Sequence, residues 1–145
     1  MDLAGVLGRI PYLRVHQLAA GEGTDGAITV RMPLCEAVTN HVGIMHAGAL
    51  FTAAETAAGV AAWRIVPGDR AFVLLRGATV RYTRRAEGEV VARGAVAAEA
   101  AEVARSTFDA KGRADVTVEV SAKDPAGETV FLGTFDYALR PRRAS

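Results

Sequence analysis

One carboxylate, Glu55, lies in the middle of a segment, residues 47–63, whose other side chains are nearly all small or apolar. An unpaired charge buried in such a segment costs several kcal/mol. Positions three or four apart share one face of a helix, and the residues that recur at this spacing around Glu55 are all small: Gly48, Thr52, Gly59 and Ala62. The pattern predicts that Glu55 lines a narrow, apolar and sparsely hydrated slot, where a carboxylate is a candidate functional group.

The residues alone leave other roles for Glu55 open. The carboxylate could pair with an arginine from elsewhere, such as Arg76 or Arg81, or it could face solvent. Gly59 adds a further constraint, because glycine inside a helix costs up to about 1 kcal/mol relative to alanine. Its presence predicts that another group approaches the backbone closely at this face, either a second helix or an elongated ligand.

Several other chemistries lack the residues that they need. The serines are Ser106, Ser121 and Ser145, and none lies in a G-x-S-x-G nucleophile motif. The glycine-rich loops that hold nucleotide phosphates are absent from the sequence. The three histidines and Cys35 lack the spacing of zinc ligands, so no metal site is expected. We interpret Cys35 as a small buried residue rather than a reactive thiol.

Length and composition favour a single globular domain over residues 1–145, since 50% of the residues are hydrophobic and 23% are charged. The formal net charge of +1 gives no reason to expect a nucleic-acid partner. The single cysteine cannot form an internal disulfide, so we expect a cytoplasmic location. The N-terminus does not resemble a signal peptide. The apolar segment is shorter than the ~20 residues that cross a bilayer, so we expect no membrane partner.

The hydrophobic periodicity predicts the elements that position Glu55. We expect a short helix over residues 2–8 and a long helix over residues 47–65, which Pro67 and Gly68 would end. Residues 98–114 allow either a strand continuation or a short helix, followed by a turn at 109–112. A turn is also expected at 124–127, and a solvated tail at 141–145. The expected strands are residues 13–20, 28–34, 72–83, 89–99, 114–124 and 128–140.

The long helix has consequences for the assembly. A helix that is hydrophobic all round must be covered on all sides. The expected strands, mostly joined by hairpins, are too few to close a barrel around it, so a curved sheet would cover one side only. We therefore expect a second copy of the chain to cover the other side in an isologous homodimer.

The motif Asn40-x5-His46-x-Gly48-x6-Glu55, at the start of an alanine-rich helix, resembles the signature of hotdog-fold acyl-CoA thioesterases. The likeness is to the phenylacetate-degradation and 4-hydroxybenzoyl-CoA thioesterase branch. Residues 80–96 resemble the strand–turn–strand that follows the helix in this family, and residues 124–140 resemble its closing hairpin. The resemblance implies an α+β fold in which a curved antiparallel sheet of five or six strands wraps a long central helix. It also implies homodimers that pair through the sheet, and in many members homotetramers.

Carried over by position, the family's roles give each motif residue a function. Glu55 would be the general base or the nucleophile that attacks the thioester. The N–H groups of Ala47 and Gly48 would stabilise the oxyanion, because the first N–H groups of a helix are unpaired. Asn40 would orient the water or the thioester, and His46 would shape the loop.

The same resemblance assigns substrate contacts. Thr52 would line the acyl site, and Arg84 and Arg85 would meet the nucleotide end of coenzyme A through its phosphates. Coenzyme A would enter as part of the substrate, so no separate cofactor is expected. The sequence departs from the family at Ala47, where a glycine is usual, and at residues 75–77, where many members carry a polar side chain. Thr79 is the expected replacement for that side chain.

The departures favour one alternative, a hotdog domain without catalytic activity that binds an acyl-CoA or another acyl ligand. A hotdog dehydratase or hydratase fits less well, because the spacing between His46 and Glu55 is not the one that those enzymes show.

Overall fold

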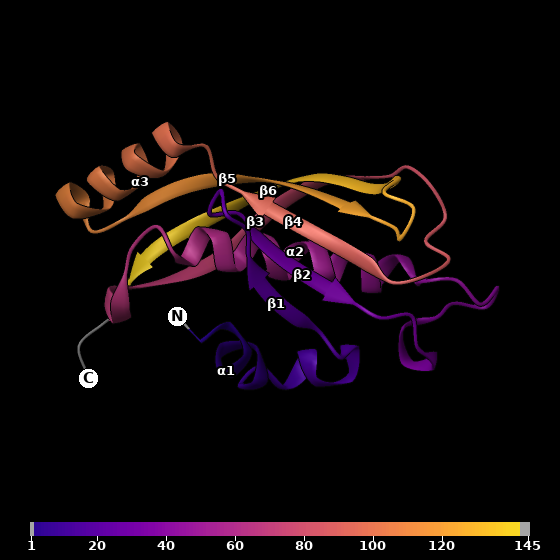
Figure 1. Cartoon of the computed structure of the whole chain (residues 1–145). Coiled ribbons are helices and arrows are strands. Elements are labelled where there is room, and N and C mark those ends of the chain that lie inside the picture. The colour runs from indigo at the N-terminus through magenta and orange to yellow at the C-terminus, as the bar shows by residue number, and fades with distance from the viewer. Residues whose placement is uncertain (1, 143–145) are drawn as a thin grey trace.

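The computed structural model describes residues 2–142, in which a long helix packs against one face of an antiparallel sheet (Figure 1). The helices are α1 (Leu3–Gly8), η1 (Pro11–His16), η2 (Glu36–Val38), α2 (Ala47–Trp63), η3 (Gly68–Arg70) and α3 (Ala98–Lys111). The strands are β1 (Ala19–Glu22), β2 (Ile28–Met32), β3 (Ala71–Tyr82), β4 (Val90–Ala95), β5 (Ala114–Lys123) and β6 (Thr129–Pro141).

The six strands form one sheet in the order β1-β2-β4-β5-β6-β3, with every neighbouring pair antiparallel. The strand number and the central helix confirm the expected α+β class. Residues 80–96 contain the end of β3, a connection and β4, as expected, but these two strands do not form a hairpin, because β3 pairs with β6 at one edge while β4 pairs with β2 and β5. The hairpin from β5 to β6 is confirmed, and the Asp124 carboxylate accepts the N–H groups of Ala126 and Glu128 in its turn.

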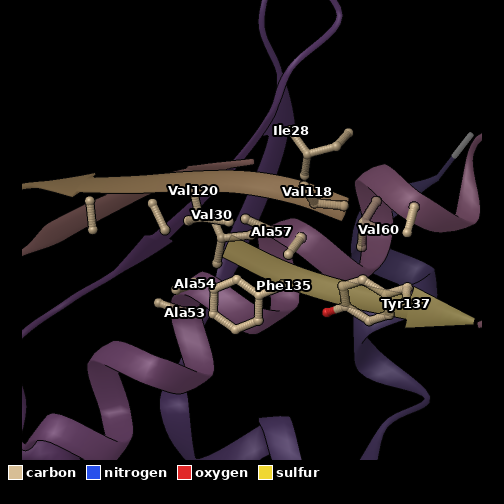
Figure 2. Close-up of a cluster of buried hydrophobic side chains, with 14 of the residues drawn as sticks. Ile28, Val30, Ala53, Ala54, Ala57, Val60, Val118, Val120, Phe135 and Tyr137 are labelled. Atoms are coloured by element: carbon tan, nitrogen blue, oxygen red, sulfur yellow. The ribbon is translucent and has the colours of Figure 1, made fainter. Parts of the chain in front are cut away.

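Helix α2 approaches the sheet closely because its contact face consists of alanines. Ala53, Ala54, Ala57 and Ala58 are fully buried, and Figure 2 shows the first three of them facing valines of the strands. A Cβ atom at Gly94 of β4 would lie 2.8 Å from the backbone carbon of Ala57. Small side chains on the helix and a glycine on the strand therefore set the distance between helix and sheet.

The N-terminal segment differs from the prediction. Residues 13–20 were expected to form a strand, yet residues 11–16 form the 3-10 helix η1, and only Ala19–Glu22 pair as β1. Pro11, whose φ is restricted to helical values, begins η1, and the buried Leu13 and His16 share one side of it. This three-residue spacing fits a 3-10 helix rather than a strand. Figure 1 shows α1 and the following turns on the side of α2 opposite the sheet.

Residues 98–111, left open by the sequence, form the helix α3. The turn expected at 109–112 is wrong for its first three residues, which complete the helix. Gly112, with φ of 67°, ends it in a left-handed conformation that glycine adopts without strain.

Other boundaries also differ. The strand expected over residues 89–99 ends as β4 at Ala95, before α3 begins at Ala98, and the strand expected over residues 28–34 ends at Met32. Helix α2 ends at Trp63, two residues before the expected end. The tail expected at 141–145 is wrong for Pro141, which belongs to β6 and pairs with Ala71, and residues 143–145 lie outside the described part of the chain. Within residues 2–142, no helix has the length and apolar composition needed to cross a membrane.

Candidate active site

Glu55 lies at the centre of α2 and is half-buried. The hydroxyl of Tyr137 on β6 donates to Glu55 Oε1 at 2.8 Å and lies 3.0 Å from the Glu55 carbonyl oxygen. The second carboxylate oxygen, Oε2, has no protein hydrogen-bond partner within residues 2–142. Arg76 pairs with Asp115 instead, and no described arginine forms an ion pair with Glu55. A phenol therefore holds one oxygen of the carboxylate and leaves the other available.

Tyr137 is suited to this role because it remains protonated. Its side chain is only 2% exposed. Burial, followed by the charge of Glu55 and the hydrogen bond to it, raises the pKa of Tyr137 far above its ordinary value. The phenol therefore keeps the proton that it donates to the carboxylate.

Gly59 makes room for this pair. A Cβ atom at Gly59 would lie 3.3 Å from the Tyr137 hydroxyl oxygen and 3.6 Å from Glu55 Oε1. The group that approaches the helix backbone is thus a tyrosine from the sheet, and not the second helix or ligand that the sequence suggested. Sequence reasoning missed Tyr137, although the alternation along β6 places it on the inward face with Phe135, as Figure 2 shows.

A cavity of about 260 Å³ lies beside Glu55. Along α2 it is lined by Thr56, Val60 and Trp63, and the strands contribute Val73, Leu75 and Tyr137. The opposite wall is the N-terminal segment, including Ile10, Tyr12 and Leu13. Glu55 is the one carboxylate in this lining, so the cavity is largely apolar and contains a single acidic side chain.

The first turn of α2 is exposed at residues 46–48. His46 caps the helix, because its Nδ1 atom accepts the N–H of Gly48 at 2.8 Å and its carbonyl accepts those of Ala49 and Leu50. The N–H of Ala47 has no partner in the described part of the chain. One of the two N–H groups expected to bind an oxyanion is therefore occupied, and the other is available.

Asn40 organises the loop that leads into α2. Its side-chain oxygen accepts the N–H groups of Val42 at 3.0 Å and Ile44 at 3.3 Å. The N–H of Met45 then donates to the carbonyl of Ala86. These bonds place the segment that follows β3 beside the start of α2.

The start and the middle of α2 are separated along its axis. Gly48 precedes Glu55 by seven residues, which is about 10 Å at 1.5 Å per residue. Within one chain, a thioester carbonyl beside Glu55 is therefore out of hydrogen-bond range of the first N–H groups of α2.

The expected substrate contacts are dispersed. Thr52 is buried, donates to the carbonyl of Gly48 and accepts from the Tyr12 hydroxyl. Thr79 lines a hollow of about 460 Å³ on the outer face of the sheet, across from α2, so the structure does not bring it to Glu55. Arg84 forms a surface ion pair with Glu128 at 3.3 Å. Arg85 is exposed and precedes Ala86, close to the start of α2.

No group of three or more histidine, cysteine, aspartate or glutamate side chains that could hold a metal ion occurs in the described residues. The arrangement around Glu55 instead provides a carboxylate held by a hydrogen bond in an apolar cavity. Such an arrangement is suited to proton transfer with a bound, largely apolar molecule.

Comparisons with known proteins identify relatives of the whole chain. A family model described as a domain of unknown function (DUF4442) matches residues 3–139. No curated protein matches the sequence. Among solved structures, a Pseudomonas aeruginosa protein of unknown function, described as a probable thioesterase, is 29% identical with a TM-score of 0.80, and the match covers 92% of this chain and 89% of that one.

Two further structures share the fold at lower identity. A thioesterase from Haemophilus influenzae has a TM-score of 0.80 at 12% identity, and the match covers 97% of this chain and 92% of the other. A Bacillus halodurans protein crystallised with CoA has a TM-score of 0.74 at 22% identity, with 98% and 89% of the two chains covered.

Proposed function

The chain belongs to the DUF4442 family and has the hotdog fold, and from this premise we propose that it is a thioesterase that hydrolyses an acyl-CoA. The observation that carries the proposal is Glu55, which has one oxygen held by Tyr137 and the other available in an apolar cavity. The likeness to a probable thioesterase at 29% identity supports the reaction class. The substrate class is supported by CoA in the structure of the Bacillus halodurans protein.

Glu55 acts as general base in the proposed mechanism. Its Oε2 atom accepts a proton from a water molecule, and the water oxygen attacks the thioester carbonyl carbon. The C–S bond of the tetrahedral intermediate then breaks, and the proton on Glu55 passes to the departing thiolate. The products are a carboxylic acid and free coenzyme A. Direct attack by Glu55 as nucleophile is the variant of this mechanism in which an acyl-enzyme anhydride precedes hydrolysis.

The oxyanion of this intermediate needs N–H donors about 3 Å away. The first N–H groups of α2 lie about 10 Å from Glu55 along the same helix, so they meet a carbonyl at Glu55 only if they come from a second copy. Ala47, whose N–H is unoccupied, is the donor that needs no rearrangement. A homodimer that brings the start of one α2 beside the Glu55 of the other completes the site.

The sheet edge formed by β3 provides a surface for this pairing. The strand has twelve residues and pairs on one side only, with β6. Phe72, Leu74 and Leu75 on it are 37%, 52% and 38% exposed. Long apolar edge strands recruit further strands, so an isologous β3–β3 contact would extend the sheet across two copies. Two such dimers could then associate as a tetramer.

Arg85, and Arg84 once released from Glu128, would bind the coenzyme A phosphates. Both follow β3, and hydrogen bonds hold this segment against the start of α2 at Met45 and, through the Tyr82 hydroxyl, at Ala47. Arginine binds phosphate through its charge and its paired donors.

Release of free thiol from acyl-CoAs by the purified protein is the direct test of the proposed function. Short, medium, long and aromatic acyl groups would be compared, with Glu55→Gln as the variant and Glu102→Gln on the exposed face of α3 as its matched control. We expect turnover of some substrate, loss of at least about 100-fold for Glu55→Gln, and no loss for the control. Absence of thiol release across the whole set would refute the hydrolase.

A specific observation favours a second candidate, a hotdog domain that binds an acyl-CoA without hydrolysing it. The His46 side chain occupies the N–H of Gly48, which removes one of the two expected oxyanion donors. This candidate predicts saturable acyl-CoA binding without thiol release, and an affinity that Glu55→Gln leaves unchanged.

A further inference from the structure

The cavity beside Glu55 continues along α2 well past the carboxylate. It extends to Trp63, eight residues after Glu55, or about 12 Å along the helix axis. The threonine and tyrosine hydroxyl groups of this lining are already paired. Thr56 donates to the carbonyl of Thr52 at 2.7 Å, and the Tyr12 hydroxyl bonds the Thr52 hydroxyl at 3.0 Å. The extension therefore offers a bound molecule mainly apolar contacts, and its one side-chain donor without a partner among residues 2–142 is the indole N–H of Trp63 at the far end.

The wall opposite α2 is built by the N-terminal segment, residues 6–13. Leu7 and Leu13 are 6% and 7% exposed and fasten the segment to the core, while the hydrogen bond from Tyr12 to Thr52 fastens it to α2. Ile10, by contrast, is 41% exposed and belongs to the cavity lining. The segment is thus fixed in place and presents an apolar surface to the cavity, although it contributes nothing to the chemistry at Glu55.

We propose that the N-terminal segment and the C-terminal half of α2 form the acyl site, and that this site takes an unbranched aliphatic chain of medium length. The inference rests on the proposed function, which places the thioester carbonyl at Glu55. A volume of about 260 Å³ holds on the order of eight groups of the size of a water molecule, which takes up about 30 Å³ in the liquid, so we expect the limit at a chain of about eight carbons. Trp63 lines the far end, and in this proposal it sets the limit of chain length.

The apolar lining also defines what the site rejects. An acyl group with a carboxylate or a hydroxyl along its chain would bury that group without a partner, which is unfavourable. Each added methylene that enters the cavity is expected to raise kcat/KM about threefold to fourfold. Once the chain reaches Trp63, further methylenes no longer contribute, and kcat/KM levels off or falls.

The test measures kcat/KM for straight-chain acyl-CoAs of increasing length. The wild-type protein should show an optimum near eight carbons. Trp63→Ala should move the optimum to longer chains, and Ile10→Trp, at a partly exposed position that tolerates a larger side chain, should move it to shorter ones. Val103→Ala, at an exposed position of α3, is the control and should leave the profile unchanged.

The outcomes separate this inference from the proposed function. If thiol is released but its dependence on length is flat, or unmoved by both cavity variants, the acyl site is overturned and the hydrolase stands. If no acyl-CoA is hydrolysed, binding of thioether analogues, which cannot be hydrolysed, is measured by calorimetry on the same variants. An affinity that rises with length and shifts in Trp63→Ala and Ile10→Trp supports the acyl site while the hydrolase fails. An affinity independent of length overturns both.

Discussion

The middle of α2 and its first turn have opposite environments, although the proposed reaction needs both. At the middle, Glu55 is half-buried, and a buried tyrosine from a distant strand holds it. At the first turn, residues 46–48 are exposed, and the bonds of His46 to Gly48, Ala49 and Leu50 are local. One chain thus supplies the hydrogen bond that holds its own carboxylate, while the N–H of Ala47 on the exposed first turn has no partner within residues 2–142. This arrangement is the one expected of a site shared between two copies.

The largest expected effect comes from preventing this sharing at the β3 edge. Ala78→Pro and Thr79→Pro remove N–H groups that point to opposite sides of β3, because successive residues alternate across an antiparallel strand. One variant loses a bond to β6 and is destabilised. The other loses only an open-edge donor, and we expect it to remain folded but monomeric, with activity reduced at least about 100-fold. Light scattering, thermal unfolding and thiol release provide the readouts. A folded variant that is monomeric and fully active would contradict the shared site.

Next in size is the loss of the hydroxyl that holds Glu55. Tyr137→Phe removes a hydrogen bond to a charged group, which contributes about 1.5–3 kcal/mol, so kcat should fall about 10- to 100-fold with little change in KM. Tyr82→Phe is the matched control at the helix start, where the hydroxyl bonds only the carbonyl of Ala47 at 3.1 Å. Its effect on kcat should be smaller. Equal losses of kcat in Tyr137→Phe and Tyr82→Phe would show that catalysis by Glu55 does not depend on the hydrogen bond from Tyr137.

The middle of α2 also predicts how stability depends on alkaline pH. The pKa of Tyr137 is raised by burial and by Glu55, whereas the unfolded phenol titrates near 10.0. Above pH 10 the unfolded chain has lost a proton that the folded chain keeps. The contribution of Tyr137 to the free energy of unfolding is therefore fully present below pH 10. It falls as the pH rises above 10, by about 1.4 kcal/mol per pH unit. Urea unfolding on both sides of pH 10 measures this slope, and Tyr137→Phe should reduce it to the smaller contribution of Tyr82, whose pKa is also raised by burial.

The same contrast explains which parts could be anticipated from the sequence. The spacing from Asn40 to Glu55 and the uniform apolar character of residues 47–63 are local properties, so the central helix and its carboxylate could be predicted from them. The fold class came from the family that this motif resembles. The bond between Tyr137 and Glu55 joins residues 82 positions apart. It depends on strand order, since β6 lies between β5 and β3 rather than at an edge. The wall formed by η1 was missed because residues 13–20 were interpreted as a strand, although Pro11 and the spacing of Leu13 and His16 favour 3-10 turns.

A smaller effect is expected at Gly59, where stability and activity should change in different directions. Alanine gains up to about 1 kcal/mol in helix propensity, but its Cβ would lie 3.3 Å from the Tyr137 hydroxyl oxygen. We expect Gly59→Ala to lower kcat several-fold by displacing the phenol from Glu55, with the free energy of unfolding unchanged or raised. Adding the substitution to Tyr137→Phe provides the control, because the hydroxyl that Cβ would meet is then absent. If Gly59→Ala lowers kcat by the same factor in the Tyr137→Phe background, contact with the Tyr137 hydroxyl is not the cause of the loss.

The smallest effect, at the first turn of α2, concerns the cap. His46→Ala removes the side-chain acceptor for the N–H of Gly48, and loss of a cap costs about 0.5–2 kcal/mol, which urea unfolding would measure. The same substitution frees that N–H for a substrate oxyanion. Activity should therefore fall less than the destabilisation of the helix start would suggest, or even rise. His46→Asn, which restores an acceptor at the cap, should recover the stability that His46→Ala loses. It should also cancel any rise in activity, because the N–H of Gly48 is then occupied again. If His46→Ala instead abolished thiol release in a folded dimer, the histidine itself would take part in the chemistry, and the first turn would no longer act through its backbone alone.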